Sequence, residues 1–148
     1  MADLNENRPG YKKTKVGGIP EEWAFINFGK MVNSSAFGPR FSSDLYDEEG
    51  NVGTLRTTDM DESGNINYSG VPIAKVEIDK FQSHLLEEND LVISRSGTIG
   101  VTGLFKGFEK PVLPGAFLIR FRLKKQNPKK LIFLAAHDNF FTILKHPV

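Results

Sequence analysis

The stretch LVISRSGTIG (residues 91–100) joins a short apolar run to a hydroxyl-rich loop with two glycines and one arginine, Arg95. A run of Leu, Val and Ile bounded by turn residues is typical of a buried strand. The loop has four candidate roles, because Ser, Thr, Gly and Arg occur in phosphate cradles, serine nucleophile sites, DNA contacts and plain turns. The neighbouring sequence narrows this choice.

Strand patterns dominate the sequence on both sides of this stretch. The clearest is AFLIRFRL (residues 116–123), in which apolar side chains alternate with Arg120 and Arg122, so the arginines are expected to face away from the apolar side. Shorter strand-like runs occur at WAFINF (residues 23–28) and VGTL (residues 52–55). Asn127-Pro128 is a typical helix start. The sequence therefore predicts a strand-rich α+β domain with one C-terminal helix.

Length and composition restrict the class of protein. The 148 residues suffice for one domain with its own core, and the absence of cysteine excludes disulfides and thiolate metal sites. No uninterrupted apolar run is long enough to cross a bilayer, and the polar start lacks the apolar centre of a secretory signal. We expect a cytoplasmic protein, with residues 1–16 as a flexible leader and residues 17–148 as a single domain.

The net charge of +1 hides a segregation of charge along the chain. Residues 41–90 carry three Lys/Arg against twelve Asp/Glu, whereas residues 91–148 carry ten against two. One interpretation is a basic face and an acidic face that meet different partners. The alternative is a folded domain in which the opposite charges neutralise each other.

Motifs for chemistry are incomplete in this chain. DMDESGNINYSG, from Asp59, nearly fits a calcium-binding loop, but Gly70 stands where a bidentate glutamate is required, so a hairpin turn is predicted instead. SRSGTIG lacks the Gly-Lys-Ser/Thr ending of a P-loop and the flanking glycines of a nucleophile elbow around Ser96. The three histidines lack metal-ligand spacing. Catalytic residues, metal sites and cofactors are therefore not predicted, although two-carboxylate chemistry is not excluded by the sequence.

Three arginines, Arg40, Arg56 and Arg95, occur in similar sequence surroundings. Each lies near short hydroxyl side chains at a turn or strand end. Guanidinium groups bind guanine edges or phosphates with two parallel hydrogen bonds, and hydroxyls reach the same groups. Taken singly, each stretch also fits an ordinary loop. The candidate DNA-binding residues are Arg40, Ser42, Arg56, Thr57, Thr58, Arg95, Ser96 and Thr98, with Lys106, Arg120 and Arg122 on nearby segments.

These stretches carry a family resemblance. VGGIPEEWAFINFGKMV (residues 16–32), GTLRTTDMDESGNI (residues 53–66), LLEENDLVISRSGTIG (residues 85–100) and VLPGAFLIRFRL (residues 112–123) resemble the target-recognition domain of type I restriction–modification specificity subunits. The resemblance covers roughly residues 13–135. One departure is Asn89, where the family usually has a glycine before the aspartate.

The resemblance implies a subunit that recognises DNA and performs no chemistry. In that family, two recognition domains each read half of a split target through loops facing the major groove, and long helices set their spacing. Methyltransferase subunits and a translocating nuclease (restriction) subunit join them. This chain resembles the first recognition domain, with the second domain and the spacer helix absent. We therefore expect a truncated or excised domain, with weak DNA affinity on its own.

The C-terminal residues bear on the partners of such a domain. Phe133, Phe140, Phe141 and Leu144 are expected either to be exposed, favouring self-association or a partner, or to pack back on the sheet. The acidic middle segment is expected to face away from DNA, toward the modification subunit. Two rival functions stay open: a protein-interaction module that binds the modification subunit without reading DNA, and a small carboxylate-based hydrolase. The DNA-reading hypothesis requires that the three arginine-bearing corners converge on a single cationic surface; corners scattered over opposite sides, or locked in internal ion pairs, would contradict it.

Overall fold

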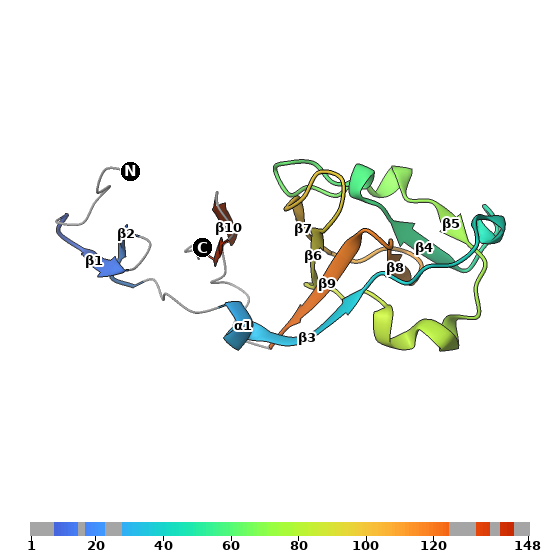
Figure 1. Cartoon of the computed structure of the whole chain (residues 1–148), viewed down its shortest axis with the longest axis horizontal. Coiled ribbons are helices and arrows are strands. Elements are labelled where there is room, and N and C mark those ends of the chain that lie inside the picture. Colours follow the sequence, from blue (N-terminus) through green and yellow to red (C-terminus); the bar gives the residue numbers. More distant parts are fainter. Residues whose placement is uncertain (1–7, 15–16, 23–27, 125–132, 137–139, 144–148) are drawn as a thin grey trace. The chain divides into compact units, whose positions relative to one another are not determined.

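A computed structural model describes residues 8–14, 17–22, 28–124, 133–136 and 140–143 of the chain (Figure 1). The chain divides into two compact units, Met1–Met31 with Lys125–Val148, and Val32–Lys124. All the candidate DNA-binding residues belong to the second unit. Among the described residues, no helix has the length and apolar character needed to cross a membrane.

The first unit contains two antiparallel strand pairs and one helical turn. Strand β1 (Tyr11–Thr14) pairs with β2 (Gly17–Pro20), so part of the stretch expected to be a flexible leader forms a strand. The helical turn is α1 (Phe28–Met31), which overlaps the expected strand of residues 23–28 only at Phe28; residues 23–27 lie outside the described residues. The boundary expected after residue 16 stays a prediction.

The C-terminal segments of this unit correct the expected helix. Strand β10 (Phe133–Ala136) pairs antiparallel with β11 (Phe140–Ile143), and the rest of the predicted helix lies outside the described residues. The physical reason is intrinsic preference, because the aromatic and β-branched residues of FFTI favour extended backbone over helix. The strand-rich α+β class itself is confirmed.

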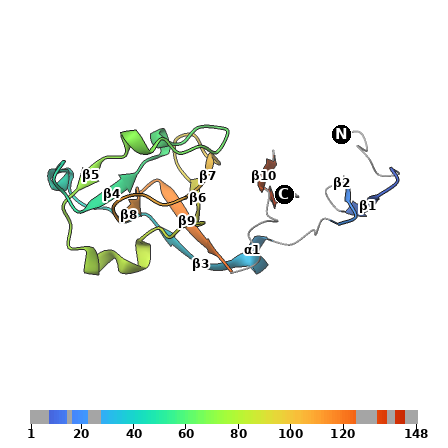
Figure 2. The ribbon, with the colours of Figure 1, turned by 180° about the vertical axis from the view of Figure 1, so that it is seen from behind.

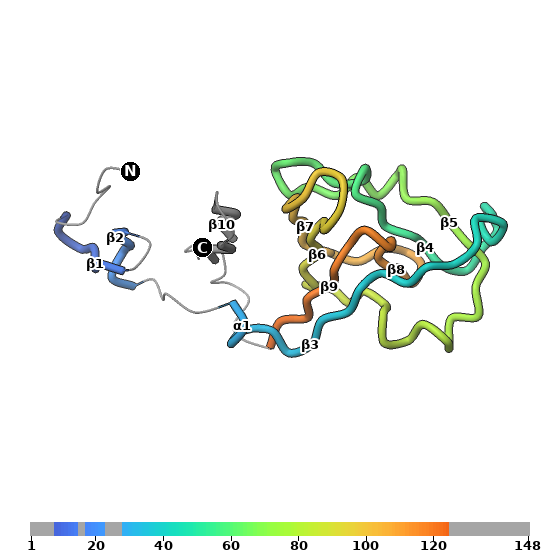
Figure 3. The backbone as a smooth tube through the Cα atoms, viewed as in Figure 1, coloured from blue at the N-terminus to red at the C-terminus, as the bar shows by residue number. Residues whose placement is uncertain are grey.

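The second unit contains two sheets (Figure 1, Figure 2). The larger has the order β3 (Val32–Phe37), β9 (Leu118–Leu123), β6 (Leu91–Ser94) and β7 (Thr102–Leu104), with every pair antiparallel. The smaller has the order β5 (Ile73–Ala74), β4 (Val52–Leu55) and β8 (Val112–Pro114), with β4 and β8 parallel. The two sheets are joined by residues 115–117, which we call the β8–β9 turn and which Figure 3 shows as a short reversal.

Short 3-10 helices fill the connections of this unit. They are η1 (Ser43–Leu45), η2 (Thr57–Asp59), η3 (Tyr68–Gly70) and η4 (Ile78–His84). Between η2 and η3, Met60 bridges Ile66, and the Asp61 carboxylate accepts hydrogen bonds from the backbone of Ser63 and Asn65. These bonds and one from the Asn65 side chain lower the pKa of Asp61. The hairpin turn predicted for DMDESGNINYSG is confirmed.

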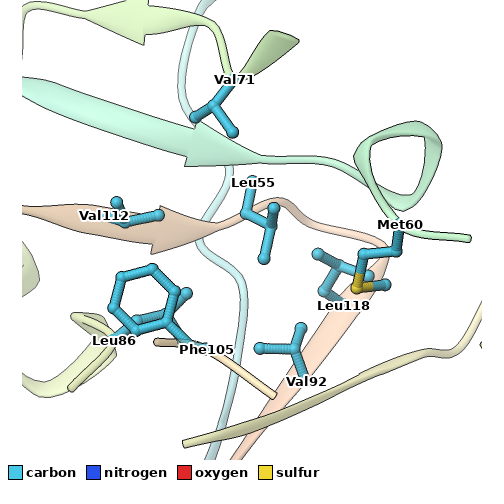
Figure 4. Close-up of a cluster of buried hydrophobic side chains, with 8 residues drawn as sticks. All are labelled: Leu55, Met60, Val71, Leu86, Val92, Phe105, Val112 and Leu118. Atoms are coloured by element: carbon cyan, nitrogen blue, oxygen red, sulfur yellow. The ribbon is translucent and has the colours of Figure 1, made fainter. Parts of the chain in front are cut away.

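Two hydrophobic clusters cover opposite faces of the smaller sheet. Leu55 and Val112 belong to the larger cluster, shown in Figure 4, whereas their strand neighbours Val52 and Leu113 belong to the other. Strands β4 and β8 are therefore buried on both faces, which explains why they carry no charged residue; the one polar side chain, Thr54, donates to the carbonyl oxygen of Pro72. The larger cluster is made of Leu55, Met60, Val71, Leu86, Val92, Phe105, Val112 and Leu118.

Strand β9 has two faces that differ in burial. Leu118 and Arg120 are 0% and 3% exposed, whereas Ile119 and Phe121 are only partly buried. Asp90 lies just before β6, the strand that pairs with β9, and its side chain is also buried. It forms an ion pair with Arg122, so the arginine charge on this face of the sheet is compensated. The predicted alternation is therefore confirmed, and the structure adds that Arg120, with Leu118, lies on the more deeply buried face.

Candidate nucleic-acid interface

The three arginine-bearing corners meet at the β8–β9 turn. The backbone N–H of Gly115 donates to the carbonyl oxygen of Leu55 at 2.7 Å, immediately before Arg56. Gly38, at the end of β3, lies so close that a Cβ there would overlap the carbonyl oxygen of Gly115. At the third corner, the backbone N–H of Arg95 donates to a carbonyl oxygen of the same turn at 2.9 Å. The backbones of the three corners therefore lie together, but the prediction also required a single cationic surface without internal ion pairs, and Arg56 pairs with Asp59.

Arg95 is held in one orientation at this meeting point. Its Nε and Nη2 donate to the carbonyl oxygen of Ala116 at 3.1 and 3.0 Å, and its Cζ lies 4.6 Å from the centre of the Phe37 ring. Within the described part of the chain, Nη1 makes no hydrogen bond, and the residue is exposed. A guanidinium fixed by an acceptor and a ring loses less side-chain entropy on binding a ligand.

The loop after Arg95 closes a β-hairpin between β6 and β7. Ser94, buried at its base, accepts from the backbone N–H of Val101 at 2.9 Å and donates through its hydroxyl to the carbonyl oxygen of Thr98. Gly97 and Gly100 have φ of +75° and +89°, a region that other residues rarely adopt. Ser96 and Thr98 are exposed. A strand follows the loop, as predicted, in place of the helix that a P-loop requires.

Arg56 is engaged within the protein. Its Nε and Nη2 donate to the two carboxylate oxygens of Asp59 at 3.1 and 2.7 Å, and Nη2 also donates to Gly70 O at 2.9 Å. The hydrogen bond that Arg56 donates to the Asp59 carboxylate raises the pKa of Arg56. Thr57 begins η2, and its hydroxyl is buried without a described hydrogen-bond partner, whereas Thr58 is exposed. Arg56 therefore stabilises this corner and adds little net positive charge to its surface.

The first corner presents Arg40 to solvent. Arg40 is exposed two residues beyond Gly38. Ser42, next along the chain, caps η1: its hydroxyl donates to the Asp44 carboxylate at 3.0 Å and accepts from the Asp44 backbone at 3.4 Å. The charged side chain of Arg40 is thus exposed to solvent, whereas the hydroxyl of Ser42 is used in hydrogen bonds to Asp44 within a turn.

Two candidate residues are not brought to this surface. Arg120 is buried and donates to Ser34 Oγ at 3.3 Å and Ser83 O at 3.1 Å; burial, followed by the charge of Arg122, lowers its pKa. It cannot reach a duplex without opening the sheet, so it is removed from the candidate set. Lys106 is exposed but follows β7, at the end of the hairpin opposite to Arg95, because Leu91 pairs with Leu104 there.

Part of the charge that is segregated along the sequence is neutralised by ion pairs within the second unit. Arg122, from the basic third of the sequence, pairs with Asp90 at 2.8 Å and Glu87 at 2.7 Å, both from the acidic third. These hydrogen bonds and charges raise the pKa of Arg122. For this cluster, mutual neutralisation is the correct alternative. The described segments contain no group of three or more His, Asp or Glu placed to hold a metal ion.

Sequence reasoning missed several residues that shape this surface. Phe117 was grouped with the packed side of β9, yet it is exposed beside Arg95, and Phe37 is exposed under the guanidinium. The signal for Phe117 was the preceding Pro114-Gly115 pair, which starts a turn before the strand. Asn89, at the opposite end of the hairpin, has a φ of 73°, which explains why a glycine suits this position in the family.

The comparisons with known proteins agree with this fold. The chain belongs to the family described as type I restriction modification DNA specificity domain, whose model matches residues 20–146. A solved structure on complex assembly and conformational transition of the type I R-M system is similar in fold, with a TM-score of 0.52 and 16% identity over 74% of this chain and 25% of that chain. The HsdS subunit from Thermoanaerobacter tengcongensis gives a TM-score of 0.48 and 14% identity over 80% of this chain and 27% of that chain.

This chain therefore spans about a quarter of the length of those two structures. A comparison with curated proteins gave no significant match. None of these findings favours a protein-interaction module that does not read DNA.

Proposed function

We propose that this chain recognises a DNA sequence as the specificity component of a type I restriction–modification system. It reads one half of a bipartite target and directs methyltransferase and restriction subunits to it, without catalysis of its own, in the cytoplasm. The observation that carries the proposal is the convergence of the three corners on the β8–β9 turn, with Arg95 oriented there and open to solvent.

Arg95 is the central contact in this proposal. Its Nη1 group has donors to spare, and a guanidinium edge matches the O6 and N7 acceptors of guanine in the major groove. Strand β6 is buried between β9 and β7, so the part of the hairpin that can enter the groove is its exposed loop, residues 95–99. Ser96 and Thr98, exposed on the same loop, supply hydroxyls to bases or phosphates.

Arg40 and the other exposed cations contribute affinity through phosphates. The second unit is not basic overall, because residues 32–124 carry ten Lys/Arg and thirteen Asp/Glu. Affinity from general attraction to DNA is therefore low, and the domain depends on the docked methyltransferase subunits to hold the duplex. This supports a reader that works only within its complex.

The acidic residues support an orientation for this complex. Asp47 and Glu49 are exposed near the start of β4, at the end of the strand opposite to Arg56. We propose that this end faces the modification subunit, since acidic side chains repel phosphates. Self-association is a further part of the proposal and is tested by sedimentation of the isolated chain at several concentrations.

The experiment compares Arg95→Ala with Lys106→Ala in the full specificity subunit assembled with its methyltransferase subunits. The duplex carries the methylated motif of a host whose only specificity gene contains this domain. Loss of a two-bond base contact costs about 1–3 kcal/mol, so Arg95→Ala should weaken binding roughly 5- to 150-fold. Lys106→Ala should stay within about 2-fold, because one exposed cation away from the interface contributes little.

Fluorescence anisotropy at two salt concentrations measures both variants, and urea unfolding verifies that they fold. Wild-type affinity should fall as salt rises, since phosphate contacts release counterions. Unchanged binding by Arg95→Ala would contradict the assignment of Arg95. Equal affinity of the wild type for the motif and for a scrambled duplex would contradict the proposed function itself.

A further inference from the structure

Exposed apolar side chains surround Arg95. Six large apolar residues are exposed in the described part of the chain, and the three most exposed all lie at this corner: Ile99 at 76%, and Phe37 and Phe117 at 56% each. Leaving such groups in water forgoes about 25 cal/mol for each Å² that burial would cover. A cluster of this kind marks a surface that meets a ligand.

The three side chains differ in what they do within the protein. Phe37 lies under the Arg95 guanidinium, and Phe117 belongs to the turn that supplies the acceptor for Arg95. Ile99 belongs to neither of the two core clusters and lies between Gly97 and Gly100 in the hairpin loop. Its loop is held from below by Ser94. Ile99 is therefore the apolar group that the fold itself does not use.

The neighbours of Ile99 indicate the chemistry of its ligand. Arg95, Ser96 and Thr98 are polar and exposed on the same seven-residue loop (residues 95–101), so the loop offers hydrogen-bond donors with one exposed aliphatic group among them. The edges of base pairs in the major groove carry the same mixture: hydrogen-bonding atoms, and a single apolar group, the 5-methyl of thymine.

We propose that Ile99 contacts the 5-methyl group of a thymine in the half-site that this domain reads. The inference rests on the proposed function and deepens it, because it assigns a base feature to one residue. Arg95 and the hydroxyls distinguish bases by hydrogen bonds, and Ile99 adds discrimination that hydrogen bonding does not supply, between thymine and a base without the methyl group.

The test replaces each thymine of the half-site, one at a time and on either strand, with deoxyuridine, which lacks only the 5-methyl group. Wild-type and Ile99→Ala subunits, assembled with methyltransferase subunits, are titrated with each duplex. Burial of one methyl group contributes about 0.8 kcal/mol, so one deoxyuridine should weaken wild-type binding about 4-fold. Ile99→Ala should bind the natural duplex less tightly and lose nothing further on that deoxyuridine.

Leu104→Ala is the matched control. Leu104 is an exposed aliphatic residue on β7 of the same hairpin, at the end away from the loop. This variant should show the same loss of affinity on deoxyuridine as the wild type. If it instead behaves like Ile99→Ala, the effect comes from shortening any aliphatic side chain on the hairpin and is not specific to Ile99.

Several outcomes would overturn the inference while leaving the proposed function intact. They are a half-site without thymine, a wild type that ignores every deoxyuridine, and an equal deoxyuridine penalty in Ile99→Ala. Loss of assembly with the methyltransferase subunits in Ile99→Ala, with the penalty unchanged, would assign Ile99 to a protein contact instead. A wild type that fails to distinguish the motif from a scrambled duplex overturns the proposed function.

Discussion

Two arginine sites in this molecule differ in everything except residue type. Arg95 lies in an exposed loop, oriented by a carbonyl oxygen and an aromatic ring, and among the described residues no carboxylate pairs with it. Arg120 and Arg122 lie on β9 beside Asp90, which is 2% exposed. The first site keeps its charge available to a ligand, whereas the second uses its charge to satisfy a buried carboxylate. The comparison teaches that the partner across the sheet decides the role of an arginine.

The largest expected effect is on the buried site. Asp90→Ala leaves Arg120 and Arg122 without their counter-charge, and removal of one partner from a buried pair costs about 3–5 kcal/mol. Because Arg122 is partly exposed, we expect a loss of unfolding free energy near the lower value, measured by urea denaturation. Glu87→Gln is the control: its carboxylate is exposed, so it should cost less than about 1 kcal/mol.

Arg95→Ala, in the same assay, should change stability by less than about 1 kcal/mol, since its ring contact is exposed. A larger loss in Arg95→Ala than in Asp90→Ala would break the contrast between the two sites.

Arg56 is the intermediate case and sharpens the comparison. Arg56→Ala removes the partner of Asp59, whose side chain is only 3% exposed, while the Arg56 side chain is 48% exposed. We expect a loss of about 1–3 kcal/mol in unfolding free energy, the cost of leaving a buried acceptor unsatisfied. In a double-mutant cycle, Asp59→Asn should reduce the cost of Arg56→Ala, because the two residues interact directly. Strict additivity would show that the ion pair contributes nothing to stability.

The smallest effect concerns the turn that presents Asp90 to the buried site. Asn89 has a φ of 73°, where an alanine is strained by about 1–2 kcal/mol and a glycine is not. Asn89→Ala should therefore lower the unfolding free energy by about 1 kcal/mol, and Asn89→Gly should leave it nearly unchanged. Thermal and urea unfolding measure both variants. A destabilised Asn89→Gly would indicate that the asparagine side chain, and not the backbone, matters.

Part of this outcome could be predicted from the sequence. The strand at Leu91–Ser94, the hairpin turn after Asp59 and the strand-rich class all follow from local patterns, because strand periodicity and turn residues act over a few positions. The C-terminal helix was predicted over a stretch where the described segments form β10 and β11. Apolar runs fit both a helix and a strand, so this pattern alone did not show that the two segments pair with each other.

The candidate site was predicted in outline. The backbones of the three corners meet as expected. Of the three corner arginines, Arg95 and Arg40 are exposed without a described acidic partner, whereas Arg56 is neutralised by Asp59. Neither Asp59 nor Gly70 could be identified as a partner of Arg56 in advance, since a salt bridge depends on geometry of a few tenths of an ångström. Ile99 had no signal of its own, because an isoleucine between glycines fits a turn as well as a contact.

The order of residues alone determined the family, the class of fold and the alternation of β9, since these depend on chemistry repeated along the chain. Only the tertiary structure decided which face of β9 is covered and which arginines reach solvent. Alternation distinguishes two faces of a strand but does not say which one another sheet or a carboxylate will meet. That choice was made by Asp90, placed beside Arg122 by the pairing of β6 with β9.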